Sequence, residues 1–293
     1  MIWKEVYIKM ENKTKNITLL LMVTMTMIFG ISFISATQCI SQEWAIWTTL
    51  NLGNSAPTVT SVVAPADITL NGGTTKTVYV DFTAEDTNGF ADLNDSSATV
   101  VMTNGAESRT STGCAILSAS GTTTQYNCTM TFQFYDSAGS WTVNASVSDL
   151  PGVSASNNTQ ASTVNALDFV EQDTSTMTWP SVTAGTNDNE ASAPLVLTNG
   201  GNQNYATVQV KGYNATSGAN VISADKFAVD DATAQTTGQT YAVEDTYTTV
   251  PTLALATHGA SVTENAFFYV DLVSGLPSGT YTQASTWKVK VST

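Results

Sequence analysis

Apolar and polar residues alternate along much of the chain between residues 58 and 164. Three stretches show the pattern, with every second residue apolar: Val78, Val80 and Phe82; Cys128, Met130, Phe132 and Phe134; Trp141, Val143, Ala145 and Val147. Successive side chains of an extended strand point to opposite faces, so this period predicts strands with one buried face. No stretch of this region sustains a helical period over three turns.

Turn residues separate these predicted strands. They occur as Asn71-Gly72-Gly73, Asn88-Gly89 and Asn104-Gly105. Asn and Gly tolerate positive φ angles, which tight turns between antiparallel strands require. Short strands joined by turns at this spacing predict a β-sandwich over residues 58–164.

Residues 165–293 predict a second β-sandwich. Apolar residues on either side of Asn199-Gly200-Gly201-Asn202 predict a hairpin, with Leu195 and Leu197 before the turn and Ala206, Val208 and Val210 after it. Further strands are predicted around Phe268, Val270 and Leu272, and around Tyr281, Trp287, Val289 and Val291.

One long apolar run, residues 17–36, lies near the N-terminus. Lys9, Lys13 and Lys15 precede it, and it ends in Ser35 and Ala36. A basic segment, an apolar core and small residues in this order are typical of a secretory signal peptide, so we expect cleavage after Ala36. The run is also long enough to span a bilayer as a helix, and a retained signal anchor is the alternative.

Residues 37–57 are expected to form an N-terminal strand and a linker. Trp44, Ile46, Leu50 and Leu52 fall on one side of an extended chain. The simpler expectation is a strand that pairs within this chain. The alternative is that residues 42–52 add as a strand to the sheet edge of another copy, which by head-to-tail repetition would grow a filament.

The chain is strongly acidic, with a formal net charge of −14. Residues 1–36 carry four Lys and two Glu, so the exported part would carry −16. Such a surface repels nucleic acid and anionic lipid, and neither is an expected partner, apart from membrane contact through residues 17–36 if they are not cleaved. An apolar content of 42% argues against disorder.

The three cysteines predict one disulfide bond. Cys114 and Cys128 flank Gly121 and a run of threonines, a spacing that suits two neighbouring antiparallel strands in an exported protein. A zinc site would need about four ligands, and the chain has one histidine. Cys39 is left over and is either free or an intermolecular link.

Five oxygen-bearing side chains crowd residues 85–95: Glu85, Asp86, Asn88, Asp92 and Asp95. Oxygen ligands at this density suit Ca²⁺, which is the one cofactor that the sequence suggests. The spacing is not that of an EF-hand, because Gly89 comes too early and Ser97 stands where the bidentate Glu belongs. The alternative is a solvated turn at the end of a strand.

No catalytic motif of the common hydrolase, metalloprotease or phosphate-loop types is present. His258 lies between Thr257 and Gly259 and is expected at the surface of a loop. A glycosidase with a pair of carboxylates leaves no local motif, and this alternative stays open. The expectation is a protein that is not an enzyme.

Two parts of the chain resemble domains of prokaryotic cell-surface proteins. The segments TAEDTNGFADLND (residues 83–95) and FYDSAGSWTVNASVSD (residues 134–149) are similar to the Ig-like or PKD-like domains of archaeal surface proteins. The positions of that family's corner and aromatic-anchored strand are occupied here by Asp136, Gly139, Trp141, Val143, Asp149 and Gly152. Trp141 stands where the family often has Tyr.

The segments APLVLTNGGNQNYATVQVKGYN and FFYVDLVSGLPSGTYTQASTWKV resemble a β-sandwich of archaeal envelope and S-layer-associated proteins. Together the resemblances imply an all-β fold of two tandem Ig-like β-sandwiches, preceded by the signal or anchor helix. They also imply stalk or adhesive modules without catalysis. Such a surface protein is compatible with glycosylation at its five Asn-x-Ser/Thr sequons, Asn94, Asn127, Asn144, Asn157 and Asn214.

The expected function is therefore that of a structural or adhesive protein, secreted or held at the cell surface. Its expected partners are other cell-envelope proteins, surface glycans or further copies of itself. One alternative is a glycan-binding module, for which the available rings are Trp44, Trp47, Trp179 and Trp287. The other is the strand-donating filament subunit.

Overall fold

The computed structural model describes residues 49–255, 258–260, 262–283 and 285–293, and in these residues the protein is all-β. The described part contains no α-helix, only two short 3₁₀ turns, and no helix in it is long and apolar enough to cross a membrane. The predicted signal or anchor at residues 17–36, Cys39, Trp44 and Trp47 lie outside the described residues.

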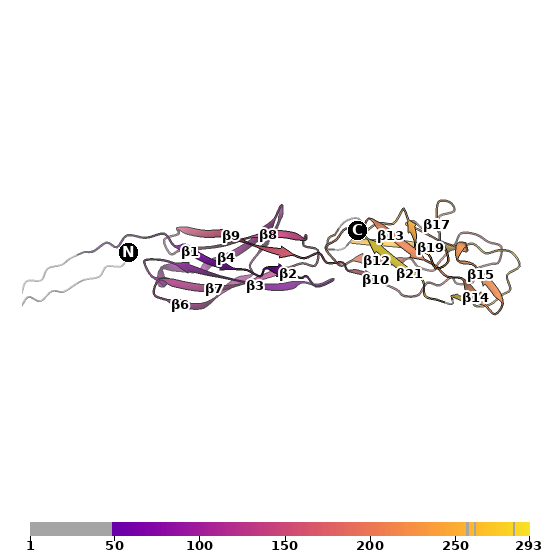
Figure 1. Ribbon diagram of the computed structural model, residues 1–293, viewed down its shortest axis with the longest axis horizontal. Coiled ribbons are helices and arrows are strands. Elements are labelled where there is room, and N and C mark those ends of the chain that lie inside the picture. The colour runs from indigo at the N-terminus through magenta and orange to yellow at the C-terminus, as the bar shows by residue number, and fades with distance from the viewer. Residues whose placement is uncertain (1–48, 256–257, 261, 284) are drawn as a thin grey trace, which may run out of the picture. The chain divides into compact units, whose positions relative to one another are not determined.

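Residues 58–164 form two sheets that share one hydrophobic core (Figure 1). In sheet order, the first contains β1 (Thr58–Val63), β3 (Lys76–Glu85), β7 (Thr123–Phe132) and β6 (Gly113–Ser120). The second contains β2 (Asp67–Ile68), β9 (Ser154–Val164), β8 (Gly139–Asp149), β4 (Leu93–Asn104) and β5 (Glu107–Thr110), with the turn η1 (Phe90–Asp92) before β4. Only the short β2–β9 pair is parallel among these strands. The arrangement is sandwich-like.

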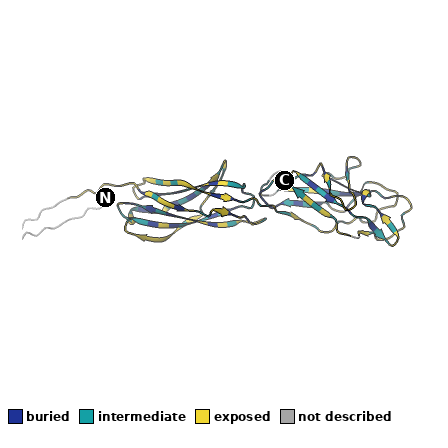
Figure 2. Ribbon diagram, in the orientation of Figure 1, coloured by how far each residue is buried: buried dark blue, intermediate teal, exposed yellow. Residues whose placement is uncertain are grey.

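The alternating positions of the sequence form this core. The three predicted sets fall on β3, β7 and β8, and Figure 2 shows buried and exposed residues alternating along the strands. Phe134 is the exception, since β7 ends at Phe132 and Phe134 is only half-buried. Trp141 is fully buried and packs edge-on against Phe132, with ring centroids 5.2 Å apart.

The disulfide bond between Cys114 and Cys128 is confirmed. The two cysteines lie directly opposite each other in the antiparallel β6–β7 pair. Cys128 is buried in the core, while β6 is the edge strand of its sheet and is mostly exposed. The bond therefore joins an exposed edge to a central strand.

The described part of residues 165–293 forms three sheets, one of six strands and two of three (Figure 1). One contains β10 (Val170–Gln172), β12 (Leu195–Asn199), β19 (Val262–Val270), β16 (Phe227–Asp230) and β17 (Thr240–Tyr241), with β11 (Asn189–Glu190) also paired to β19. The second sheet contains β18 (Thr248–Val250), β13 (Thr207–Lys211) and β21 (Lys288–Ser292). The third contains β15 (Asn220–Ile222), β14 (Ala215–Ser217) and β20 (Thr282–Gln283). The 3₁₀ turn η2 (Ala224–Lys226) lies between β15 and β16. Their buried residues form cores separate from the first.

The predicted hairpin around residues 199–202 is wrong. Its two strands belong to different sheets: β12 pairs with β10 and β19, whereas β13 pairs with β18 and β21. The intervening loop packs against residues 165–169 instead of turning back. The Asn202 amide donates to the carbonyls of Asn165 and Asp136, and a Cβ on Gly201 would lie 2.2 Å from the Leu167 carbonyl oxygen.

The C-terminal apolar stretch is also divided. Gln283 lies in β20, which pairs with β14, whereas Val289 and Val291 lie in β21, which pairs with β13. Trp287 precedes β21 and packs edge-on against Phe227, at 5.4 Å between ring centroids. One predicted strand thus contributes to two sheets.

Candidate functional site

Three aspartates come together in the first sheet pair, two from the β3–β4 connection and one from the end of β8. Asp86 directly follows β3, Asp92 ends the η1 turn, and Asp149 is the last residue of β8. The pairing of Leu93 with Asp149 places the start of β4 beside the end of β8. One carboxylate oxygen from each aspartate lies within 4.8 Å of the others.

Backbone hydrogen bonds hold the connections in this arrangement. Asp86 Oδ1 accepts the Asn88 amide at 2.7 Å, and the Asp92 carbonyl accepts the Leu150 amide at 2.7 Å. Gly89 has a φ of 106°, a conformation that residues with a Cβ rarely adopt. The Asn-Gly turn noted in the sequence is therefore what allows Asp86 and Asp92 to approach each other.

The site concentrates negative charge in a buried place. Asp86 and Asp149 are almost fully buried, and Asp92 is half-buried. Burial, and then the charges of Asp86 and Asp149, raise the pKa of the Asp92 carboxyl above its ordinary value. Asp86 Oδ2 is buried without a hydrogen-bond partner. An unpaired buried carboxylate oxygen is costly, so the arrangement suits a bound cation.

Only two of the five predicted calcium ligands belong to this cluster. The side-chain oxygens of the other three accept hydrogen bonds elsewhere: Glu85 from Thr122, Asn88 from the Ser55 amide, and Asp95 from the Tyr126 hydroxyl. Burial, and then the hydrogen bond to Asp95, raise the pKa of Tyr126. The member of the cluster that the loop pattern missed is Asp149, which the resemblance placed at the end of the aromatic-anchored strand.

A second constellation surrounds His258. Its Nε2 lies 3.2 Å from the Ser137 hydroxyl, and its Nδ1 lies 2.9 Å from Asn204 Oδ1. His258 was expected at the surface of a loop, and in the structure it is half-buried beside Ser137 and Asn204. A serine and an oriented histidine are two parts of a hydrolase triad, in which the histidine must take the hydroxyl proton.

The Ser137 hydroxyl, however, is held by a carboxylate. It donates to Glu107 Oε1 at 2.7 Å, and the Ser137 amide donates to Glu107 Oε2 at 3.0 Å. A hydroxyl proton given to Glu107 is not available to the imidazole. The Ser137 carbonyl also accepts the Trp141 indole N–H at 2.9 Å. These bonds favour a structural role for the serine.

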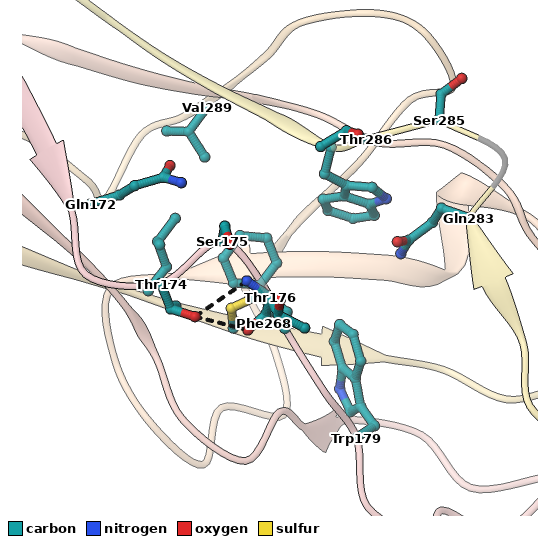
Figure 3. Close-up of a pocket in the computed structure, with 13 residues that line it drawn as sticks. Gln172, Thr174, Ser175, Thr176, Trp179, Phe268, Gln283, Ser285, Thr286 and Val289 are labelled. Carbon is teal, nitrogen blue, oxygen red and sulfur yellow. Dashed lines mark hydrogen bonds between the residues drawn. The ribbon is translucent and has the colours of Figure 1, made fainter.

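A cavity of about 390 Å³ opens in the part formed by residues 165–293 (Figure 3). Its lining is Gln172, Thr174, Ser175, Thr176, Met177, Trp179, Leu195, Phe268, Gln283, Ser285, Thr286, Trp287 and Val289. Gln172 and Gln283 stand on opposite sides of it (Figure 3). Trp179 and Trp287 both pack edge-on against Phe227. Their rings therefore belong mainly to the core and do not form an exposed platform for a sugar ring.

The five sequon asparagines are all half-buried. In the folded protein three of their side-chain amides donate hydrogen bonds, Asn127 to Asp81, Asn157 to the Val59 carbonyl, and Asn214 to Glu244. A glycan would attach to the same nitrogen and leave it one N–H. Glycosylation at these positions stays a prediction.

Comparisons with known proteins do not identify the chain. No protein-family model matches it, and no curated protein matches it. Among solved structures it is similar to a secreted serine protease, VesC from Vibrio cholerae, with 14% sequence identity and a TM-score of 0.21. The match covers 86% of this chain and 56% of that one. At this TM-score the similarity carries no argument about fold or activity.

Proposed function

We propose that this is an exported, non-catalytic protein of tandem Ig-like β-sandwiches that has a structural or adhesive role at the cell surface. The disulfide supports export, because such bonds persist in oxidising compartments. The acidic composition supports a soluble protein that avoids nucleic acid.

The observation that carries the structural role is the free edge of β6. Among the described residues this strand pairs only with β7, and its sequence GCAILSAS contains no charged residue. Ile116 and Leu117 are exposed by 48% and 59%. Sheet edges of monomeric proteins are usually protected by charges, bulges or prolines, and here the protection is one irregularity between Ile116 and Ser118. The edge therefore suits pairing with another strand.

A second copy of this chain can supply that strand from its N-terminal segment. Leu50 and Leu52 are exposed by 74% and 80%, and the described residues 49–57 belong to no strand. Residues 42–52 add two tryptophans and an isoleucine to these leucines. Strand addition would give backbone hydrogen bonds to the β6 edge and bury apolar side chains of both copies.

The first test compares two lysine substitutions of equal exposure in the same sheet. Leu117→Lys at the β6 edge should abolish self-association of the mature protein, because a lysine would be buried in the paired interface. Tyr79→Lys on the central strand β3, where the side chain is also 59% exposed, should leave association unchanged. Sedimentation velocity measures both variants beside the wild type.

Deletion of residues 37–52 identifies the donor. We expect a folded monomer with unchanged thermal stability and no assembly. A destabilised monomer would instead show that the segment pairs within its own chain. Equal self-association of all variants would overturn the proposal of assembly through the β6 edge.

The cavity favours glycan binding as a second candidate function. It combines indole rings with the amides and hydroxyls that recognise sugar hydroxyls. The indole N–H of Trp287 is buried without a partner. If glycans bind there, Gln172→Ala and Gln283→Ala should each weaken binding on an array of surface polysaccharides by about tenfold, the effect of one lost hydrogen bond. Unchanged binding by both variants would exclude this cavity.

A further inference from the structure

The three-aspartate cluster concentrates negative charge in one place. The described residues form two ion pairs, Arg109 with Asp136 and Lys211 with Asp245, and neither includes Asp86 or Asp92. Three carboxylates within 4.8 Å of one another repel strongly where two of them are buried. A cation bound among the three carboxylates would relieve this repulsion.

The unpartnered Asp86 Oδ2 points to the same conclusion independently. Asp86 Oδ1 already accepts the Asn88 amide, so Oδ2 is the oxygen of this carboxylate left for a ligand. Buried side-chain oxygens normally have a partner in the protein, in water or in an ion. A buried carboxylate oxygen without a protein partner, in a cluster of three, is the environment of a metal ligand.

The donor atoms select a hard cation. The cluster contains only carboxylates, which favour Ca²⁺, Mg²⁺ or Mn²⁺ over metals that prefer thiolate or imidazole. Oxygen ligands of one Ca²⁺ lie about 2.3–2.6 Å from the ion, so they can be as far apart as about 4.8 Å, whereas Mg²⁺ holds its ligands at about 2.1 Å. Oxygens within 4.8 Å of one another can therefore share one Ca²⁺ ion, the larger and more tolerant of the two cations.

We propose that Asp86, Asp92 and Asp149 bind a single Ca²⁺ ion that locks the β3–β4 connection to the end of β8. The site does not depend on the proposed assembly, since it lies within one sheet pair. It replaces the loop-only site expected from residues 85–95 by one that joins two distant parts of the sequence.

The test is thermal unfolding of the full-length mature protein in 0.15 M NaCl, with Ca²⁺ or with chelator. Ligand bound only to the folded state raises Tm by mass action, so we expect a rise of roughly 5–10 °C at a Ca²⁺ concentration 100-fold above Kd. Isothermal titration calorimetry should give one ion per chain.

Asp92→Asn should shift Tm relative to the wild type in different directions with and without Ca²⁺. In chelator its Tm should equal or exceed that of the wild type, because one of three repelling carboxylates is neutral. In Ca²⁺ its Tm should be lower, because a ligand is lost. Asp86→Asn should likewise lose the response to Ca²⁺, whereas Asp67→Asn, an exposed aspartate of the same sheet pair, should keep it.

Equal Tm of the wild type in Ca²⁺ and chelator would overturn the proposal. So would a Ca²⁺ response of the same size in Asp92→Asn and Asp67→Asn, since it would show general screening of an acidic surface. If Asp86→Asn does not fold, titration calorimetry of Asp92→Asn still tests the site: its Ca²⁺ binding should be weaker than that of the wild type, and unchanged binding would overturn the proposal.

Discussion

Replacing Trp141 with alanine should lower the free energy of unfolding of residues 58–164 by about 3–5 kcal/mol, the range for large aromatic residues in cores. Trp141 is fully buried and contacts Phe132 across the two sheets. Removing the indole leaves a cavity between two hydrogen-bonded sheets, since β7 and β8 are each paired on both sides. Urea unfolding followed by circular dichroism measures the loss.

Trp141→Phe separates packing from hydrogen bonding. The phenyl ring retains much of the volume but cannot donate to the Ser137 carbonyl, so we expect a loss of about 1–2 kcal/mol. Tyr79→Ala on the exposed face of β3 is the matched control, and its effect should stay within about 0.5 kcal/mol. A loss for Trp141→Ala no larger than that of the control would contradict the assignment of Trp141 to the core.

Removing the Cys114–Cys128 bond should have the second largest effect. The bond closes a loop of 14 residues in sequence separation. In the chain-entropy model, opening a loop of this size stabilises the unfolded state by about 3 kcal/mol. The double variant Cys114→Ala/Cys128→Ala should lose this amount or slightly more, because Cys128 also fills space in the core.

Reduction of the wild type gives an independent measurement of the same bond. Dithiothreitol should lower wild-type stability by a similar amount and leave the double-alanine variant unchanged. If reduced and oxidised wild type unfold at the same urea concentration, the bond does not constrain the unfolded chain. In that case the exposed edge strand β6 is held by its hydrogen bonds to β7 alone.

The strands of the first sheet pair and the disulfide could be predicted because both follow from short-range patterns. Alternation at residues 78–82 and 141–147 marks a buried face whatever the partner strand is. The turns at Gly73, Gly89 and Gly105 have the positive φ angles that the Asn-Gly sequences indicated. Cys114 and Cys128 are close in sequence, so one hairpin brings them together.

The failed hairpin shows the limit of such patterns. Leu195 to Val210 has alternating strands and a turn sequence, yet the loop crosses from one sheet to another. The turn residues are used for close packing, since Gly201 approaches the Leu167 carbonyl and Asn202 is buried among backbone groups. Alternation tells which face of a strand is buried but not which strand lies beside it.

The candidate site depends on the same distinction. Asp86 and Asp92 are close in sequence, and their oxygen-rich loop pointed to Ca²⁺ without the structure. That Asp149 joins them depends on the register of β8 against β4. Glu85, Asn88 and Asp95 instead have partners on other parts of the chain, Thr122, Ser55 and Tyr126. Residue type and local spacing therefore determined the all-β character, the turns and the disulfide. Long-range strand order and register decided which carboxylates meet, because they alone bring together residues that are distant in sequence.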